Sequence, residues 1–167
     1  FDKVVPSAPR KKAKEDVRKR RKHFGRSDYQ KLLDGSQRRS EALSALIQLG
    51  AYTGARIEEL CSLKLDNVTE DRFKIEDSKT SAGIREIPIH THIRKLVAQL
   101  KKDSTDGYLL SGLTLNKYND RSNAVGKQFG RLKADLGYGP DYVFHSLRKG
   151  VATQLETAGI AENVTAR

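Results

Sequence analysis

The spacing of apolar residues along this 167-residue chain limits the folds that it can adopt. Through most of the chain, apolar residues recur every three to four positions, which is the period of an amphipathic helix. Polar and apolar residues alternate in 72–75 and 84–89, and the segment between them, 77–83, is rich in turn-forming residues. Two short alternating runs around a turn predict a β-hairpin. The sequence therefore predicts a mostly α domain with one small antiparallel sheet, of the α+β class.

Turn and capping signals divide the chain further. Ser27-Asp28-Tyr29-Gln30 has the pattern of a capping box and marks the expected start of the folded domain. Thr53-Gly54-Ala55 separates two helices, because glycine permits a tight turn. The helices predicted from the apolar spacing are 38–52, 56–63, 91–102, 117–136 and 145–158.

Positive charge is concentrated at the N-terminal end of the chain. The formal net charge is +11, of which residues 1–40 carry +9 and the remainder +2. A basic cluster of this kind attracts polyanions, although a solvated linker has the same composition. We therefore divide the chain into a basic arm, residues 1–26, and a folded domain, residues 27–167.

The sequence also argues against several classes of protein. No apolar run approaches the roughly 20 residues that span a membrane, and no signal-peptide pattern is present. The single cysteine, Cys61, excludes an internal disulfide and a cysteine-based zinc site. The chain starts at Phe1 and contains no methionine, so we expect a piece of a longer protein. The use of a single cysteine favours a reducing, intracellular location, and we expect the cytoplasm.

Four basic residues stand in contexts that suit a phosphate. His145 and Arg148 are three positions apart and share a face if their segment is helical. An arginine offers a rigid set of donors, and a histidine can transfer a proton near neutral pH. Arg56 lies at an expected helix start, where backbone N–H groups also point outward. Lys79 lies at the tip of the predicted hairpin. Each residue alone also fits an ordinary surface position, Arg56 beside a nearby carboxylate and Lys79 in solvent.

Three longer motifs contain these residues, in this order along the chain. They are Tyr52-Thr53-Gly54-Ala55-Arg56-Ile57-Glu58-Glu59-Leu60 with Leu63-x-Leu65-Asp66 after it, Ser78-Lys79-Thr80 followed by Arg85-Glu86-Ile87-Pro88-Ile89, and Phe144-His145-Ser146-Leu147-Arg148-Lys149-Gly150-Val151-Ala152-Thr153. The first and third motifs resemble the two arginine boxes of the tyrosine recombinase (phage integrase) family, and the second resembles its hairpin lysine. The resemblance covers roughly residues 27–167 and implies the catalytic domain of a site-specific DNA recombinase.

The resemblance implies a role for each matching residue. Arg56 and Arg148 would bind the scissile phosphate and stabilise its transition state. Lys79 would protonate the leaving 5′-oxygen, and His145 would act as a general acid/base or as a further donor. The support residues expected near the first arginine are Glu59 and Asp66. The residues expected to contact DNA are Lys19, Arg20, Arg21, Lys22, Arg85 and Lys149. No metal and no cofactor are implied, because cationic side chains supply the charge stabilisation.

The nucleophile of the family is a tyrosine that follows the second arginine box. All six tyrosines of this chain precede His145, so the nucleophile is expected beyond Arg167. The chain by itself is therefore expected to form a phosphate site without cleaving DNA. A second departure is Lys149, which stands where the family often has another histidine.

The resemblance implies double-stranded DNA as the partner, and a tetramer of the full-length protein assembled on it, with no membrane contact. Two alternatives stay open at this point. One is a non-catalytic DNA-binding module of the same fold that has lost its nucleophile. The other is a type IB topoisomerase-like enzyme, which shares the chemistry, although the short spacing between the motifs favours an integrase.

Overall fold

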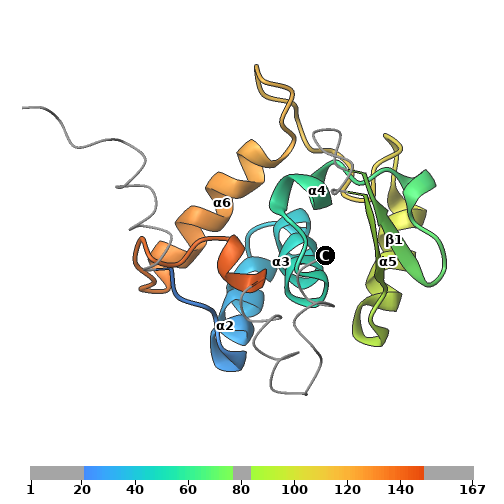
Figure 1. Cartoon of the computed structure of the whole chain (residues 1–167). Coiled ribbons are helices and arrows are strands. Elements are labelled where there is room, and N and C mark those ends of the chain that lie inside the picture. Colours follow the sequence, from blue (N-terminus) through green and yellow to red (C-terminus); the bar gives the residue numbers. More distant parts are fainter. Residues whose placement is uncertain (1–20, 77–83, 149–167) are drawn as a thin grey trace, which may run out of the picture.

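The computed structural model describes residues 21–76 and 84–148, and Figure 1 shows how their helices and strands are arranged. The elements, in chain order, are α2 (Arg26–Gln37), α3 (Glu41–Thr53), α4 (Ile57–Cys61), η1 (Leu65–Asn67), β1 (Arg72–Ile75), β2 (Arg85–Pro88), η3 (Thr91–Ile93), α5 (Arg94–Asp103) and α6 (Ser122–Asp135). The helix α3 packs against α2, α4 and α6, and α4 also packs against α6. In Figure 1, α2, α3 and α6 lie on one side of the molecule, the hairpin and α5 lie on the other, and α4 lies between them. The predicted mostly α fold with a small antiparallel sheet is confirmed.

The helix α3 forms the centre of the core. Its apolar residues recur at positions that face α2, α4 and α6, and Leu43, Leu46, Ile47 and Leu49 are completely buried. Burial of a leucine or isoleucine side chain stabilises a fold by roughly 1.5–3 kcal/mol relative to its exposed state. Ser40 begins the helix, because its side chain accepts a hydrogen bond from the N–H of Leu43.

The two strands pair as the sequence predicts. β1 and β2 are antiparallel, with Ile75 opposite Arg85 and Arg72 opposite Pro88. The residues of β1 alternate between exposed and buried, which agrees with the period of the sequence. Pro88, which lacks an N–H, is the last residue of β2, as expected for a strand end. The predicted tip, residues 77–83, lies outside the described residues.

Several predicted helix boundaries are wrong, and local hydrogen bonds explain two of them. The N-cap of α2 is Gly25 and not Ser27, because the carboxylate of Asp28 accepts a hydrogen bond from the N–H of Gly25 at 2.9 Å. The helix predicted from residue 117 begins only at Ser122. Before it, the side chain of Asn116 accepts hydrogen bonds from two backbone N–H groups and holds residues 116–120 in a turn.

The last residues of the predicted arm contribute to the core. Phe24 is buried and packs edge-on against Phe129 and Tyr138, with ring centroids 6.2 and 5.3 Å apart. The N–H of Lys22 donates to the backbone carbonyl of Asp141 at 3.1 Å. Lys22 and Phe24, which the sequence assigned to the arm, therefore contact the folded domain.

A glycine of α3, Gly50, lies in close contact with the segment 144–148. A Cβ built on Gly50 would lie 2.6 Å from Cζ of Phe144 and 3.4 Å from Cδ1 of Leu147. Contacts under 3.0 Å require the neighbouring atoms to shift. Gly50 therefore sets the distance between α3 and the segment that carries His145 and Arg148.

We expect Gly50→Ala to lower the free energy of unfolding by about 1–3 kcal/mol, because the added methyl overpacks the core against the ring of Phe144. Urea unfolding measures this change. The matched control is Gly130→Ala in α6, where nothing lies within 4 Å of the built Cβ. That control should be neutral or stabilising, because alanine favours a helix over glycine. Equal effects of the two substitutions would contradict the role of Gly50.

Candidate active site

The short helix α4 positions the first arginine of the site. Gly54 ends α3 with φ of 62°, a left-handed conformation that favours glycine, and the chain then turns into α4. Arg56 is the N-cap of α4, so the helix start expected there is confirmed. Its N–H donates to Oε2 of Glu59 at 2.7 Å, and its Nη1 donates to Oε1 of the same carboxylate at 2.9 Å. Glu59 thereby holds both the backbone and the side chain of Arg56.

A second arginine reaches the same carboxylate from the hairpin. Arg85, the first residue of β2, donates from Nη2 to Oε2 of Glu59 at 2.6 Å and from Nη1 to Oε1 at 3.2 Å. The side chain of Glu59 is 8% exposed, whereas those of Arg85 and Arg56 are 16% and 56% exposed. Burial raises the pKa of Glu59, but the hydrogen bonds from the two arginines outweigh it and lower the pKa below its usual value. The carboxylate is therefore ionised throughout the physiological pH range.

A third arginine lies close to these two. Arg148 is half-buried, and burial lowers the pKa of its guanidinium, as do the positive charges of Arg85 and Arg56, while Glu59 raises it. Arg148 forms no ion pair or hydrogen bond with another residue of the described segments 21–76 and 84–148. Two guanidinium groups thus pair with one carboxylate, and the third is close enough to be affected by its charge. Two positive charges are in excess among these four side chains. Such a site is suited to bind an anion with paired oxygens, such as a phosphate.

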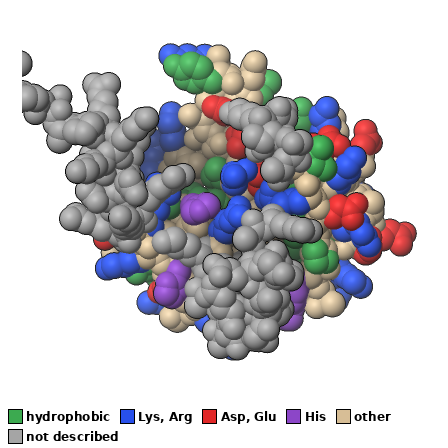
Figure 2. Space-filling model, in the orientation of Figure 1, with side chains coloured by type: hydrophobic (Ala, Val, Ile, Leu, Met, Phe, Trp, Pro, Cys, Tyr) green, Lys and Arg blue, Asp and Glu red, His purple; other side chains and the backbone are tan. Residues whose placement is uncertain are grey.

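The segment 144–148 is anchored by its apolar residues. Residues 145–148 are helical, and Phe144 and Leu147 are buried against α3 and α6. Ser146 is buried as well, and its hydroxyl accepts a hydrogen bond from the N–H of Val143 at 3.0 Å. His145 is left exposed at the surface. Figure 2 shows one face of the molecule, on which Lys and Arg side chains gather near the middle, next to a histidine.

The structure brings together some of the predicted site residues and leaves others apart. Arg56, Glu59, Arg85 and Arg148 form one cluster. Asp66 lies in η1 with an exposed side chain, and no hydrogen bond or ion pair joins it to Arg56 among the residues described. Glu59 contacts Arg56 where Asp66 does not, because Glu59 is at the third position of the helix that Arg56 begins.

The remaining predicted site residues lie at the ends of the described segments or outside them. Arg21 is partly buried, and Lys22 is exposed with its Nζ 5.9 Å from the ring centre of Tyr142. The predicted site residues that fall outside the described segments are Lys19, Arg20, Lys79 and Lys149. Among the described residues, no group of three or more histidine, cysteine or acidic side chains could hold a metal ion.

A comparison with protein-family models decides the assignment. Residues 22–166 match the model of the phage integrase family. The chain belongs to the phage integrase family. The integrase of Enterobacteria phage 434 is 27% identical over 151 residues, which are 86% of this chain and 42% of that protein. The chain therefore spans less than half the length of this phage relative.

Solved structures share the fold of this integrase-family chain at low sequence identity. A lambda integrase dimer bound to a core site has a TM-score of 0.67 and 21% identity, over 87% of this chain and 43% of that one. XerA recombinase has a TM-score of 0.66 and 19% identity, over 86% and 54% of the two chains. The catalytic core of lambda integrase has a TM-score of 0.64 and 21% identity, over 83% and 85%.

The sequence did not predict the contacts of two residues that support the site, Glu58 and Arg121. The carboxylate of Glu58 accepts hydrogen bonds from the N–H groups of Arg121 and Ser122, at 2.9 and 2.8 Å, and so caps the start of α6. Arg121 is buried and donates to the carbonyls of Cys61 and Leu110. Glu58 and Arg121 are 63 positions apart, so no local pattern could have revealed their contact.

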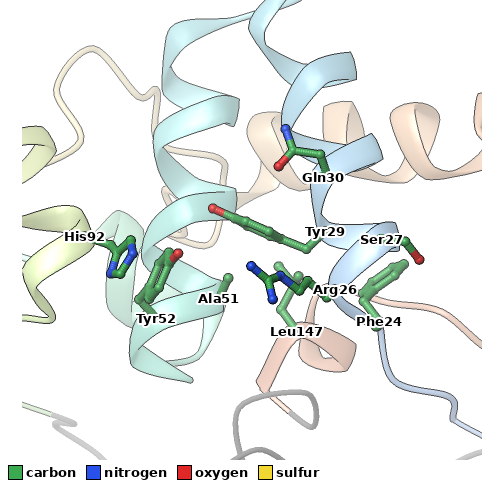
Figure 3. A pocket seen from close by; sticks show the side chains of 10 residues that line it. Phe24, Arg26, Ser27, Tyr29, Gln30, Ala51, Tyr52, His92 and Leu147 are labelled. Atoms are coloured by element: carbon green, nitrogen blue, oxygen red, sulfur yellow. The ribbon is translucent and has the colours of Figure 1, made fainter.

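A separate cavity of about 1150 Å³ lies beside this site. Its lining residues are Phe24, Gly25, Arg26, Ser27, Tyr29, Gln30, Ala51, Tyr52, His92 and Leu147. Figure 3 shows Tyr29 of α2 extending towards Tyr52 of α3, with His92 beside Tyr52. Burial and the neighbouring Tyr52 raise the pKa of Tyr29 to about 12. Tyr29 therefore stays a neutral phenol across the physiological pH range.

No helix among the described residues is both long enough and apolar enough to span a bilayer.

Proposed function

We propose that the full-length protein is a site-specific DNA recombinase that cleaves and rejoins strands through a phosphotyrosyl intermediate. The observation that carries this proposal is the cluster of Arg56, Arg85 and Arg148 around the single carboxylate of Glu59. Two excess positive charges in a partly buried site match the charge of a scissile phosphate as it approaches its transition state. The family membership of the chain supports the same reaction.

In the proposed reaction, Arg56 and Arg148 bind the non-bridging oxygens of the phosphate. A tyrosine hydroxyl gives its proton to a general base, its oxygen attacks the phosphorus and forms the phosphotyrosyl bond, and the bond from phosphorus to the 5′-oxygen breaks. Lys79 gives a proton to the leaving 5′-oxygen, and His145 acts as a general acid/base or as a further donor. Attack by a 5′-hydroxyl on the phosphotyrosyl bond reverses these steps and rejoins the strand. We propose that this tyrosine follows Arg167 in the full-length protein.

We propose double-stranded DNA as the partner and a tetramer as the assembly that recombines two duplexes. Relatives support both points, since one lambda integrase structure is a dimer bound to a core site and another is a tetramer bound to a Holliday junction. The cationic side chains of the cluster supply the charge stabilisation, so the proposed reaction requires no metal or cofactor. The protein would act on DNA in the cytoplasm.

The test uses the full-length protein and a nicked duplex that carries its recombination site. Cleavage beside the nick releases a short strand that diffuses away, so the covalent protein–DNA adduct accumulates and is counted on a denaturing gel. We expect an adduct that a tyrosine-to-phenylalanine change after residue 167 abolishes. An adduct that survives replacement of every tyrosine beyond residue 167 would contradict the proposal.

A non-catalytic DNA-binding module of the same fold is the alternative. It would bind DNA with a strong salt dependence and form no covalent adduct with any duplex. The intact set of Arg56, Glu59 and Arg148 favours the enzyme, because a binding module has no use for a buried carboxylate that orients an arginine.

The basic arm provides a prediction about DNA binding. Neutralising Lys19, Arg20, Arg21 and Lys22 together should reduce the slope of log K against log salt by up to about 0.9 for each phosphate contact that is lost. Fluorescence titrations of a labelled duplex at several salt concentrations measure the slope. The control is the neutralisation of Lys101 and Lys102 at the end of α5. An unchanged slope in the arm variant would mean that the arm does not contact DNA.

A further inference from the structure

The hydrogen-bonding capacity of Glu59 is completely used within the protein. An ionised carboxylate has about four acceptor positions. Glu59 accepts four hydrogen bonds, two from Arg56 (its N–H and Nη1) and two from the Nη1 and Nη2 groups of Arg85. The carboxylate is also nearly buried, so water cannot replace a lost partner easily.

The two arginines share this carboxylate unequally. Arg85 directs two side-chain nitrogens at Glu59 in the parallel geometry that makes arginine–carboxylate pairs strong. It is also the more buried of the two, at 16% against 56% side-chain exposure for Arg56. Arg85 thus faces the interior carboxylate, and Arg56 faces the surface where a phosphate would arrive.

The loss of Arg85 would change Arg56 through Glu59. Two acceptor positions of a buried carboxylate would lose their donors, and the guanidinium of Arg56 is a neighbouring group that could satisfy them. Its attraction to Glu59 would then compete with its attraction to a phosphate. Loss of the positive charge of Arg85 would also weaken the attraction of the site for an incoming phosphate at short range.

We propose that Arg85 is a positioning residue, which saturates and neutralises Glu59 so that Arg56 remains directed at the scissile phosphate. This role replaces the direct DNA contact that the sequence suggested for Arg85, and it rests on the proposed recombinase function. It also ties the start of β2, on the hairpin, to α4, although Arg85 and Glu59 are 26 positions apart.

The test is a double-mutant cycle in the full-length protein, with the nicked duplex described above. Arg85→Gln should slow formation of the covalent adduct by about 10- to 100-fold, the range of coupling between residues in direct contact. In a Glu59→Gln background, where no charge is left to neutralise, adding Arg85→Gln should cost less than about 3-fold. Arg85→Lys keeps the charge with fewer donors and should fall between Arg85→Gln and the unaltered protein. It also provides a second variant if Arg85→Gln does not fold.

A binding measurement separates positioning from direct contact. The salt slope of DNA binding should be unchanged by Arg85→Gln, whereas a residue that contacts a phosphate would lower it by about 0.9. The matched control is Arg72→Gln on β1, which removes an exposed arginine paired with Asp71 and Glu86 on the same hairpin. This control should leave both the adduct rate and the slope unchanged.

Two results would overturn the role of Arg85. One is a lowered salt slope, which does not depend on cleavage. The other is an equal loss of adduct from Arg85→Gln in the presence and in the absence of Glu59. If the unaltered protein forms no adduct, the proposed function itself fails, so the two failures are distinguishable.

Discussion

Replacing Arg148 with alanine is expected to slow strand cleavage by the full-length protein by about 10²–10³-fold, equivalent to about 3–4 kcal/mol of transition-state stabilisation. Arg148 lies within the field of Arg56 and Arg85, and it forms no ion pair with a described residue that it would have to break. In the proposed reaction, its donors would bind the charge that develops on the scissile phosphate. The adduct rate on the nicked duplex measures the effect.

DNA affinity should fall only modestly in the same variant, because one phosphate contact among many contributes little to binding. The control is Arg39→Ala, which removes an exposed arginine paired with Asp135 at the end of α6. Equal losses of affinity and cleavage in Arg148→Ala would contradict a transition-state role and would favour the binding module.

The second large effect is on stability. Arg121→Ala is expected to lower the free energy of unfolding by about 2–4 kcal/mol, because each buried acceptor left without a donor costs about 1–3 kcal/mol. The guanidinium of Arg121 donates to the carbonyls of Cys61 and Leu110, pairs with Asp106 at 3.0 Å and stacks on Tyr108, 3.7 Å from its ring centre. Its removal leaves two buried carbonyls without donors and opens a cavity.

Urea unfolding measures this change, with Arg131→Ala as the control. Arg131 is an exposed residue of the same helix, and its replacement should change the free energy of unfolding by less than about 0.5 kcal/mol. If Arg121→Ala lowers the free energy of unfolding by less than about 1 kcal/mol, the network contributes little to stability.

The same network has a defined pH dependence. Burial raises the pKa of Asp106, but hydrogen bonds from the N–H of Tyr108, from Arg121 and from the N–H of Gly112 lower it to about 2. A lowered pKa in the folded state means that the contribution is complete above the unfolded value near 4 and is lost as pH falls towards 2. Arg121→Ala should therefore weaken the loss of stability between about pH 4 and 2.

The features that the sequence predicted well depend on neighbouring residues. The apolar spacing of 43–49 predicted the core helix, the alternation of 72–75 predicted a strand, and Gly54 predicted the break before Arg56. Each of these features depends on residues within about one helical turn or one strand, where apolar spacing and the backbone freedom of glycine determine the local structure. The position of Arg56 at a helix start follows from the same local signals.

The contacts within the site could not be predicted in this way. Glu59 and Asp66 were equal candidates to support Arg56, and only the helical geometry of α4 brings Glu59 to it. The pairing of Arg85 with Glu59 joins two elements that are distant in the sequence, and no spacing rule links them. The start of α6 depends on Glu58, a residue of another helix, and so local helix preference placed it about five residues too early.

The two adjacent carboxylates of α4 restrict the length that this segment can have. Glu58 caps α6 on one side, and Glu59 holds the arginine cluster on the other. Successive residues of an α-helix are rotated by about 100°, so an insertion or deletion of one residue in α4 would move both carboxylates away from their partners at once. Related proteins should therefore vary in length in the exposed turn 111–120, while the spacing from Arg56 to Cys61 stays constant.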